Sequence, residues 1–254
     1  MAAELSEAQF QRYARHLILN EVGEAGQARL MAARVLVVGA GGLGSPLLLY
    51  LAAAGIGTLG VVDDDVVDLS NLQRQIIHPT AAIGARKVES ARAALHAINP
   101  EVTVETVARR IEAANAEALI DPYDLVADGS DNFTTRYLLN DVCYRLKKPL
   151  IGAALAPFEG QISTFKAYLG PPHPCYRCLF REPPPPDLVP RCETAGILGA
   201  VAGVMGTLQA VEVLNELLDL GSSLSGTLLL YDALNAGFHR ITVPRDPDCP
   251  TCSA

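Results

Sequence analysis

Short apolar runs alternate with amphipathic stretches along this chain. Such runs, rich in β-branched residues, are typical of strands in a sheet whose two faces are both covered. They predict strands at residues 35–38, 59–62, 102–107, 124–127, 150–155 and 161–168. Helical periodicity predicts helices at residues 6–19, 26–33, 45–54, 87–99, 111–120 and 133–146. Strands that alternate with helices predict an α/β fold with a Rossmann-like, doubly wound, mostly parallel sheet.

The first predicted strand runs into a glycine-rich turn. Gly39, Gly41 and Gly44 fit the pattern G-x-G-x-x-G, and Asp63 ends the second strand 24 residues after the first glycine. Glycines let the backbone approach a phosphate, a helix N-terminus favours negative charge, and the acid suits ribose hydroxyls. The pattern predicts a nucleotide site, and alone it fits a nicotinamide or flavin dinucleotide as well as ATP.

Two cations beyond Asp63 favour a triphosphate. Ser70-Asn71-Leu72-Gln73-Arg74-Gln75 follows Asp63 closely, and Lys87 lies 13 residues beyond Arg74. Arginine offers a fork of donors to phosphate oxygens and lysine a point charge. The alternative is that Arg74 and Lys87 are solvated surface charges.

A third polar segment, Asp128-Gly129-Ser130-Asp131-Asn132, directly follows the strand at 124–127. The carboxyl ends of parallel strands meet at one edge of a sheet, so we expect Asp131 beside Asp63. Asp131 is suited to hold Mg²⁺ on phosphates. It is also placed to cap the helix at 133–146, and the two roles are compatible.

Two C-x-x-C pairs predict a metal site. They are Cys175 with Cys178 and Cys249 with Cys252. Four cysteines in two such pairs suit a tetrahedral, structural zinc site that would staple a C-terminal extension to the body. Disulfides and a redox pair are the alternatives, and a reducing compartment disfavours disulfides.

The other two cysteines differ in context. Cys143 lies in an apolar helical pattern and is predicted to be core. Cys192 follows a proline-rich run and precedes the uncharged stretch at 194–211, next to Arg191. A thiol before a helix N-terminus and beside a cation is activated, but an incidental loop cysteine fits the same local sequence.

Composition limits the partners. The chain has 254 residues, half of them hydrophobic, and a net charge of −8, which argues against nucleic acid or an anionic membrane as partner. The run at 194–211 carries four glycines and Gln209 before Glu212, so a buried helix beginning near Gly196 is expected instead of a membrane span. The start of the chain lacks signal-peptide features, and we expect a cytoplasmic protein.

Together the motifs resemble the MoeB/ThiF family, relatives of the adenylation half of ubiquitin-activating enzymes. The residues that carry this likeness are Arg12-Tyr13-x-Arg15, the glycine turn, Asp63-x-Asp65, residues 70–75, Lys87, Ser130-Asp131-Asn132, Glu159-Gly160-Gln161, both cysteine pairs and Cys192. Nearly the whole chain is covered. The resemblance implies one adenylation domain over 1–254, with N-terminal helices at 1–33, a nucleotide-binding core at 34–168, and a zinc and crossover-loop region at 169–254.

The resemblance implies ATP-dependent adenylation of the C-terminal glycine of a ubiquitin-like sulfur carrier ending in Gly-Gly, with release of pyrophosphate. The attacking carboxylate, with a pKa of about 3.5, needs no general base. Catalysis then rests on alignment and on cations that stabilise the developing charge. By carry-over, Asp63 holds the ribose, Arg74 and Lys87 the phosphates, Asn71 a nearby oxygen and Asp131 the magnesium. The implied nucleotide contacts are Gly42, Asp63, Ser70, Asn71, Leu72, Gln73, Arg74, Lys87, Asp131 and Asn132.

Further expectations come from the same resemblance. Arg15 matches an arginine that reaches into the neighbouring subunit's site, which implies a homodimer. Cys192 matches a cysteine that some relatives use in a thioester or persulfide step. Sulfur is expected from a separate sulfurtransferase or cysteine desulfurase, for molybdopterin, thiamine or another thiolated product. A nucleotide-binding partner protein without turnover and an NAD-dependent oxidoreductase remain as alternatives.

Overall fold

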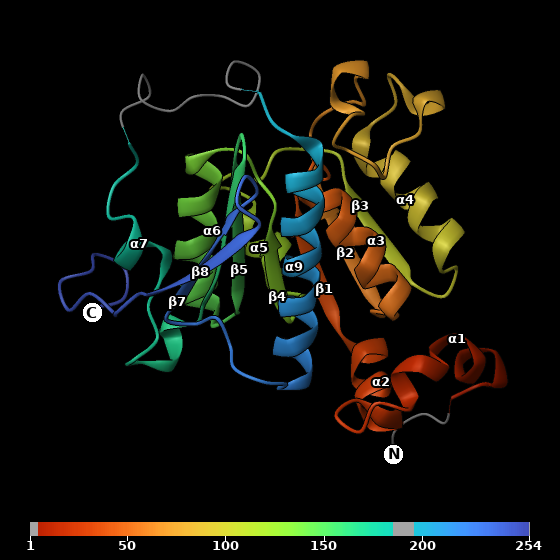
Figure 1. Ribbon diagram of the computed structural model, residues 1–254, viewed down its shortest axis with the longest axis horizontal. Helices are drawn as coiled ribbons and strands as arrows, with labels where there is room; N and C mark the ends of the chain where they lie inside the picture. Colours follow the sequence, from red (N-terminus) through yellow and green to blue (C-terminus); the bar gives the residue numbers. More distant parts are fainter. Residues whose placement is uncertain (1–4, 185–195, 254) are drawn as a thin grey trace.

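A single eight-stranded sheet organises the computed structural model, which describes residues 5–184 and 196–253. The strand order is β3-β2-β1-β4-β5-β6-β7-β8 (Figure 1). The strands are β1 (Arg34–Val38), β2 (Thr58–Val62), β3 (Thr103–Val107), β4 (Leu125–Asp128), β5 (Leu150–Ala156), β6 (Glu159–Phe165), β7 (Thr227–Asp232) and β8 (Gly237–Thr242). The first five are parallel and the last three antiparallel. The predicted parallel sheet is confirmed for β1 to β5, and the C-terminal strands make the whole sheet mixed.

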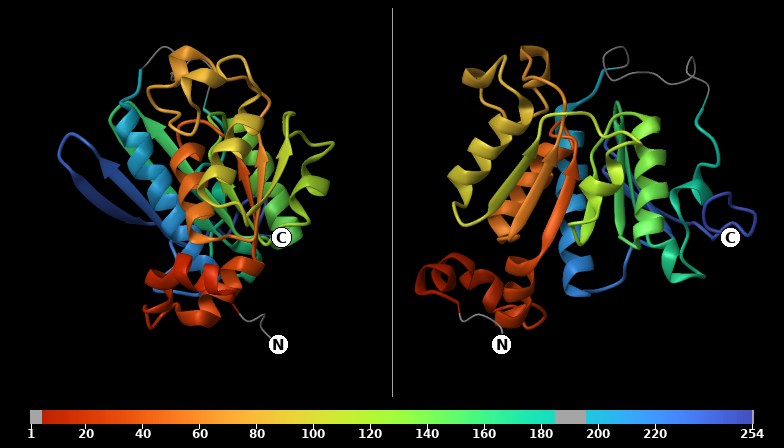
Figure 2. Two further views of the ribbon diagram at one scale, coloured as in Figure 1. Left: turned by 90° about the vertical axis from the view of Figure 1, so that its right-hand side faces the viewer. Right: turned by 180° about the vertical axis from the view of Figure 1, so that it is seen from behind.

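Helices cover both faces of this sheet (Figure 2). They are α1 (Glu7–Leu17), α2 (Gly23–Ala32), α3 (Gly44–Ala54), α4 (Lys87–Ile98), α5 (Ala116–Ile120), α6 (Phe133–Leu146), α7 (Tyr176–Leu179) and α9 (Gly199–Leu218). Because side chains alternate along a strand, Val35 and Val37 of β1 join a core with α3 and α9, whereas Leu36 and Val38 join one with α5 and α6. Burial of β1 on both faces explains its continuous apolar run.

The chain reverses its direction across the sheet between β1 and β4. From β1 it passes through α3 to β2 and on to β3, then returns through α5 to β4 on the other side of β1. Ligands of open α/β sheets bind outside the carboxyl ends of the strands at such a switch point. The turn after β1 and the loop after β4 therefore flank the expected site.

Several boundaries differ from the prediction, and three of the differences have a clear local cause. The helix expected at 111–120 covers only Ala116–Ile120, because the Asn115 side chain accepts from Glu112 N and donates to Arg110 O, which holds a turn instead. The strand expected at 161–168 is Glu159–Phe165 and stops where its pairing with β5 ends. The helix expected near Gly196 begins at Gly199, after Gly196 in a left-handed conformation (φ +74°).

α9 is long and apolar enough to span a membrane by length and composition, and it is the one such helix among the described residues. Val201, Met205 and Val213 are nevertheless buried against the sheet and α3. The prediction of a buried helix is confirmed.

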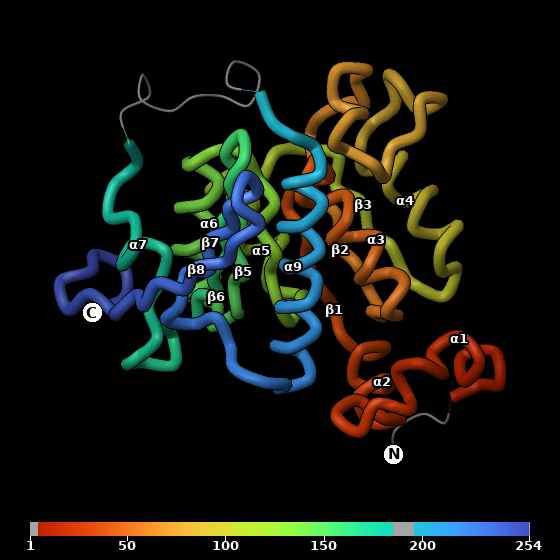
Figure 3. The backbone as a smooth tube through the Cα atoms, viewed as in Figure 1, coloured from red at the N-terminus to blue at the C-terminus, as the bar shows by residue number. Residues whose placement is uncertain are grey.

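The two ends of the chain lie at opposite sides of the molecule (Figure 3). α1 and α2 lie beside the amino ends of the parallel strands, where Tyr13 is buried and its hydroxyl accepts from Asn99 Nδ2 (2.9 Å). The C-terminal tail lies beside α7, beyond the antiparallel strands.

Candidate active site

The turn after β1 requires glycine at two positions. Gly39 has a left-handed φ of +99°, and a Cβ there would lie 2.8 Å from the carbonyl oxygen of Gly129 in the loop after β4. A Cβ on Gly44 would overlap the Gly39 carbonyl oxygen. The two loops at the switch point are thus in direct contact. α3 begins at Gly44 without a side-chain cap. Ser45 N and Leu47 N already donate to the carbonyl oxygens of Gly41 and Leu43, and Pro46 has no N–H, so the helix offers a phosphate its positive end more than free amides.

Asp63 is fixed by the backbone around it. One oxygen accepts from Ala40 N (2.8 Å) in the glycine turn and the other from Asp65 N (2.9 Å). Burial raises the pKa of Asp63, and the positive charge of Lys87 opposes that shift. The carboxylate is held at the end of β2, as the predicted ribose contact requires.

Lys87 is buried rather than solvated. Only 4% of the residue is exposed, and Nζ donates to Asp65 Oδ2 (2.9 Å). The solvated-charge alternative is therefore wrong for Lys87. A buried ammonium keeps little hydration, so it interacts strongly with any anion beside it.

Arg74 reaches the glycine turn from the loop before α4. It is partly buried, its Nη1 donates to Ser70 O (3.2 Å), and its Cγ lies 3.6 Å from where a Cβ on Gly42 would be. Asn71 donates to Ser70 Oγ (3.2 Å), while Gln73 faces Gly199 at the start of α9. The segment at 70–74, which includes Leu72, thus lies against the turn.

The loop after β4 carries Asp131 as an exposed side chain. The cap of α6 is Asn132, whose Oδ1 accepts from Thr135 N (2.9 Å), so the capping role proposed for Asp131 is wrong. Arg136 donates to Ser130 O (2.9 Å) and fixes the loop. Asp131 Oδ1 accepts a long hydrogen bond from Asn132 Nδ2 (3.4 Å), and the exposed carboxylate stays accessible to a ligand.

Three polar residues at the site were given no role in the sequence analysis. His78 donates from Nε2 to Ala40 O (2.8 Å), and its Nδ1 pairs with Ser90 Oγ (2.9 Å). Burial lowers the pKa of His78, which favours the neutral ring. Gln75 Oε1 and Ser130 Oγ are buried without a hydrogen-bond partner in the described structure. Unpaired buried polar atoms are costly, and these two flank the glycine turn, where a polar ligand would satisfy them.

Arg15 does not join this site. It is exposed on α1, beside the amino ends of the parallel strands, whereas the glycine turn and Asp63 lie at their carboxyl ends (Figure 1). Within one chain Asp63 and Arg74 contact the glycine turn, Lys87 lies close to Asp63, and the loop that carries Asp131 meets the turn at Gly129. Arg15 lies at the far edge.

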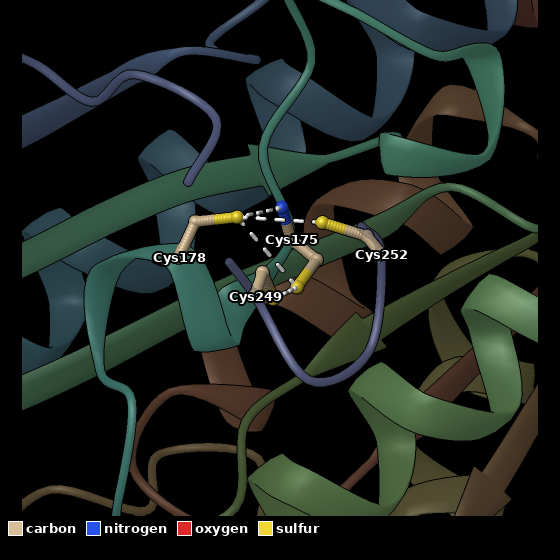
Figure 4. A group of neighbouring side chains, drawn as sticks. All are labelled: Cys175, Cys178, Cys249 and Cys252. Atoms are coloured by element: carbon tan, nitrogen blue, oxygen red, sulfur yellow. Dashed lines mark hydrogen bonds between the residues drawn. The ribbon is translucent and has the colours of Figure 1, made fainter. Parts of the chain in front are cut away.

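The four predicted metal ligands converge. Cys178 Sγ lies 3.9 Å from Cys175 Sγ and 3.4 Å from Cys252 Sγ, and Cys175 Sγ lies 3.5 Å from Cys249 Sγ (Figure 4). Tetrahedral zinc–thiolate bonds would hold the sulfurs about 3.8 Å apart. All four thiols are free, so the disulfide alternative finds no support. Burial and the neighbouring Cys178 raise the pKa of Cys175, a cost that a bound divalent cation would remove.

Cys143 and Cys192 are the two cysteines outside the C-x-x-C pairs. Cys143 is buried in α6, as predicted, and burial raises the pKa of its thiol. Cys192 lies outside the described residues.

Comparison with known proteins identifies the family. The family model named ThiF matches residues 13–251. The SAMP-activating enzyme E1 of Haloferax volcanii is 50% identical over 99% of this chain and 92% of its own length. The sulfur carrier protein adenylyltransferase of Thermus thermophilus is 51% identical over 95% of this chain and 90% of its own. The chain belongs to the ThiF family.

The predicted family and enzyme class are thereby confirmed for this ThiF-family protein. A further relative, the adenylyltransferase and sulfurtransferase MOCS3 of Bos taurus, is 51% identical over 98% of this chain. The chain spans 54% of that relative's length. None of the relatives named here is an oxidoreductase.

Solved structures of more distant proteins share the fold of this ThiF-family protein. E. coli MccB with AMPCPP and MccA superposes with a TM-score of 0.83 at 22% identity, covering 99% of this chain and 76% of that one. E. coli MccB with ATP gives 0.79 at 20% identity, covering 99% and 83%. At these identities the likeness concerns the fold alone.

Proposed function

We propose that this protein uses ATP to adenylate the C-terminal glycine of a ubiquitin-like sulfur carrier. The supporting observation is that Asp63 and Arg74 contact the glycine turn, with Lys87 close to Asp63, at the switch point of a ThiF-family fold. The SAMP-activating enzyme E1 and the sulfur carrier protein adenylyltransferase are 50% and 51% identical in sequence to this chain over nearly its whole length.

The residues support the reaction by alignment and charge. Asp63, held by two backbone amides, receives the ribose hydroxyls. Lys87 and Arg74 sit where the α-phosphate and the departing pyrophosphate gain negative charge, and fixed cations stabilise that charge without reorganising. The carrier's carboxylate attacks the α-phosphorus, the bond to the bridging oxygen breaks, and pyrophosphate leaves with the electron pair. No side chain has to move a proton.

Two metals complete the proposal. Magnesium on the exposed Asp131 would neutralise phosphate charge during the reaction. Zinc on Cys175, Cys178, Cys249 and Cys252 would be structural, since four thiolates leave no open position.

We also propose a homodimer in which Arg15 completes the neighbouring subunit's site, because Arg15 is exposed and far from the site of its own chain.

We propose that this adenylation reaction precedes sulfur transfer and that a separate protein supplies the sulfur. Relatives named MOCS3 and MoeZ combine adenylyltransferase and sulfurtransferase in their names, which supports an adenylation step that is followed by sulfur transfer.

ATP–pyrophosphate exchange with Mg²⁺ tests the function. Exchange should appear with one carrier from a panel of small proteins ending in Gly-Gly. Arg74→Ala and Asp131→Ala should each reduce the exchange rate about 100-fold or more, since each removes charge stabilisation at the reacting phosphates. Arg92→Ala, an exposed cation on α4 paired with Glu89, should leave it unchanged. Full activity in both site variants would refute the residue assignment.

A further inference from the structure

A single carboxylate on α6 contacts both cysteine pairs. Asp141 Oδ1 accepts from Arg177 Nε (3.0 Å), and Oδ2 accepts from Arg177 Nη2 (2.8 Å). Oδ1 also accepts from Thr251 Oγ1 (3.0 Å). Arg177 lies between Cys175 and Cys178, and Thr251 lies between Cys249 and Cys252. Asp141 therefore bonds to the middle of each C-x-x-C pair.

The first pair is docked on α6 by neighbouring contacts as well. Asn140 Oδ1 accepts from Tyr176 N (2.7 Å), and the guanidinium of Arg177 stacks on the Tyr137 ring at 4.5 Å. Arg177 is thereby held between a carboxylate and an aromatic face. Such a fork-to-fork pair fixes direction as well as distance, which a lysine could not do.

The second pair has less support of its own. Residues 243–253 contain no helix or strand in the described structure, and 70 residues separate Cys178 from Cys249. Arg245 donates to the carbonyl oxygens of Ala167 (2.7 Å) and Cys252, which ties down the tail. The Thr251–Asp141 bond is the described side-chain contact that joins the two pairs through α6.

We propose that Asp141 is a positioning residue that brings the two cysteine pairs together for the metal. The inference rests on the proposed zinc site. Four thiolates around a divalent cation carry net negative charge, and the positive Arg177 that Asp141 holds is close enough to Cys175 to interact with it electrostatically. Asp141 touches no cysteine itself and orients the ligands through Arg177 and Thr251. Groups that orient metal ligands typically change metal affinity about 10- to 100-fold when removed.

Zinc affinity, measured by competition with a chromogenic chelator, tests the proposal on the full chain. The wild type should bind one zinc ion per chain. Asp141→Asn, which keeps the shape but loses the charged pair, should weaken zinc binding about 10-fold or more, and Asp141→Ala at least as much. Glu117→Gln is the matched control. Glu117 of α5 forms an exposed ion pair with Arg145 of α6, the helix that carries Asp141, and it touches neither cysteine pair.

A second variant separates metal positioning from general stability. Thr251→Val should weaken zinc binding by less than Asp141→Asn, and the double variant no more than Asp141→Asn alone, because both changes act through one carboxylate. A lower melting temperature with unchanged zinc affinity would show that Asp141 only supports α6, and additive losses would show that Thr251 acts independently. Either result would overturn the proposal. A wild type that binds no zinc would refute the metal assignment itself, a result distinct from failure of Asp141 alone.

Discussion

As the proposed ribose contact, Asp63 would make nucleotide binding depend on the charge of its carboxyl group. Its two oxygens each accept a backbone N–H, from Ala40 and from Asp65, so the side chain cannot rotate away from the glycine turn. Only the ionised carboxylate accepts hydrogen bonds with both oxygens at once. Burial raises its pKa against the opposing charge of Lys87, so it takes up a proton at a higher pH than an exposed aspartate.

ATP affinity should therefore fall as the pH is lowered, beginning above the range in which exposed aspartates titrate. Calorimetric titration of ATP between about pH 5 and 8 measures this dependence. Asp63→Asn should bind ATP more weakly at neutral pH, and its affinity should change less with pH than that of the wild type. Because ATP itself titrates, the comparison is the difference between the two proteins. Parallel pH profiles would contradict the assignment. Asp219→Asn, which alters an exposed ion pair with Arg29, should match the wild type.

At this scale, sequence motifs point to residues proposed to contact the ligand more readily than to residues that hold those in place. Asp63 could be proposed from its place at a strand end, whereas spacing left Lys87 open between a phosphate contact and a solvated charge until its burial was known. His78 was missed because its role depends on loop packing that brings it to Ala40 O and Ser90. Asp141 was missed for a related reason, since its partner Thr251 is 110 residues away.

Among the elements, α9 approaches the glycine turn closely at one of its own glycines. A Cβ on Gly206 would overlap Leu43 O and press against Pro46 at the start of α3. Gly203, on the same helix, has nothing within 4 Å of its Cβ position. An alanine substitution would therefore meet a crowded backbone at Gly206 and open space at Gly203.

Gly206→Ala should lower the free energy of unfolding by about 1–3 kcal/mol, because the added methyl group has to displace the backbone of α3 or α9. Gly203→Ala should raise it by about 0.5–1 kcal/mol through the better helix propensity of alanine. Denaturant unfolding of both variants gives the two values. ATP affinity should also fall in Gly206→Ala, since Leu43 is the cap residue of the phosphate-binding helix. Equal effects of the two changes would mean that α9 does not lie so close to the turn.

Element prediction succeeded where local pattern and tertiary burial agree. β1, β2 and β4 were readable because both faces are covered, which leaves uninterrupted apolar runs. The edge strand β3 has no buried residue and was predicted from its alternating pattern instead. β7 and β8 were not predicted: their connecting turn holds Ala236 at φ +50° instead of a glycine, and β8 is almost wholly exposed. Their place in the sheet is set by pairing with β6, which local sequence does not encode.

For the whole molecule, the position of α1 decides how a complete site can form. Arg15 is exposed beside the amino ends of the parallel strands, opposite the turn that it is proposed to serve (Figure 1). An arginine at that edge can act on the nucleotide only in another copy of the chain. A two-fold dimer would give each of its two sites one such arginine from the neighbour.

Mixing two inactive variants tests this arrangement. Arg15→Ala and Lys87→Ala should each abolish carrier-dependent ATP–pyrophosphate exchange on their own. In a mixed dimer, one site receives Arg15 from the Lys87→Ala chain and Lys87 from the Arg15→Ala chain, so it is intact. Random exchange of equal amounts makes half of the dimers mixed, each with one intact site, so about one quarter of wild-type activity should return. A mixture of Lys87→Ala with Arg74→Ala is the control, because both losses fall in one chain's own half of the site and no intact site can form. Recovery in that control, or none in the first mixture, would show that Arg15 does not act across the dimer.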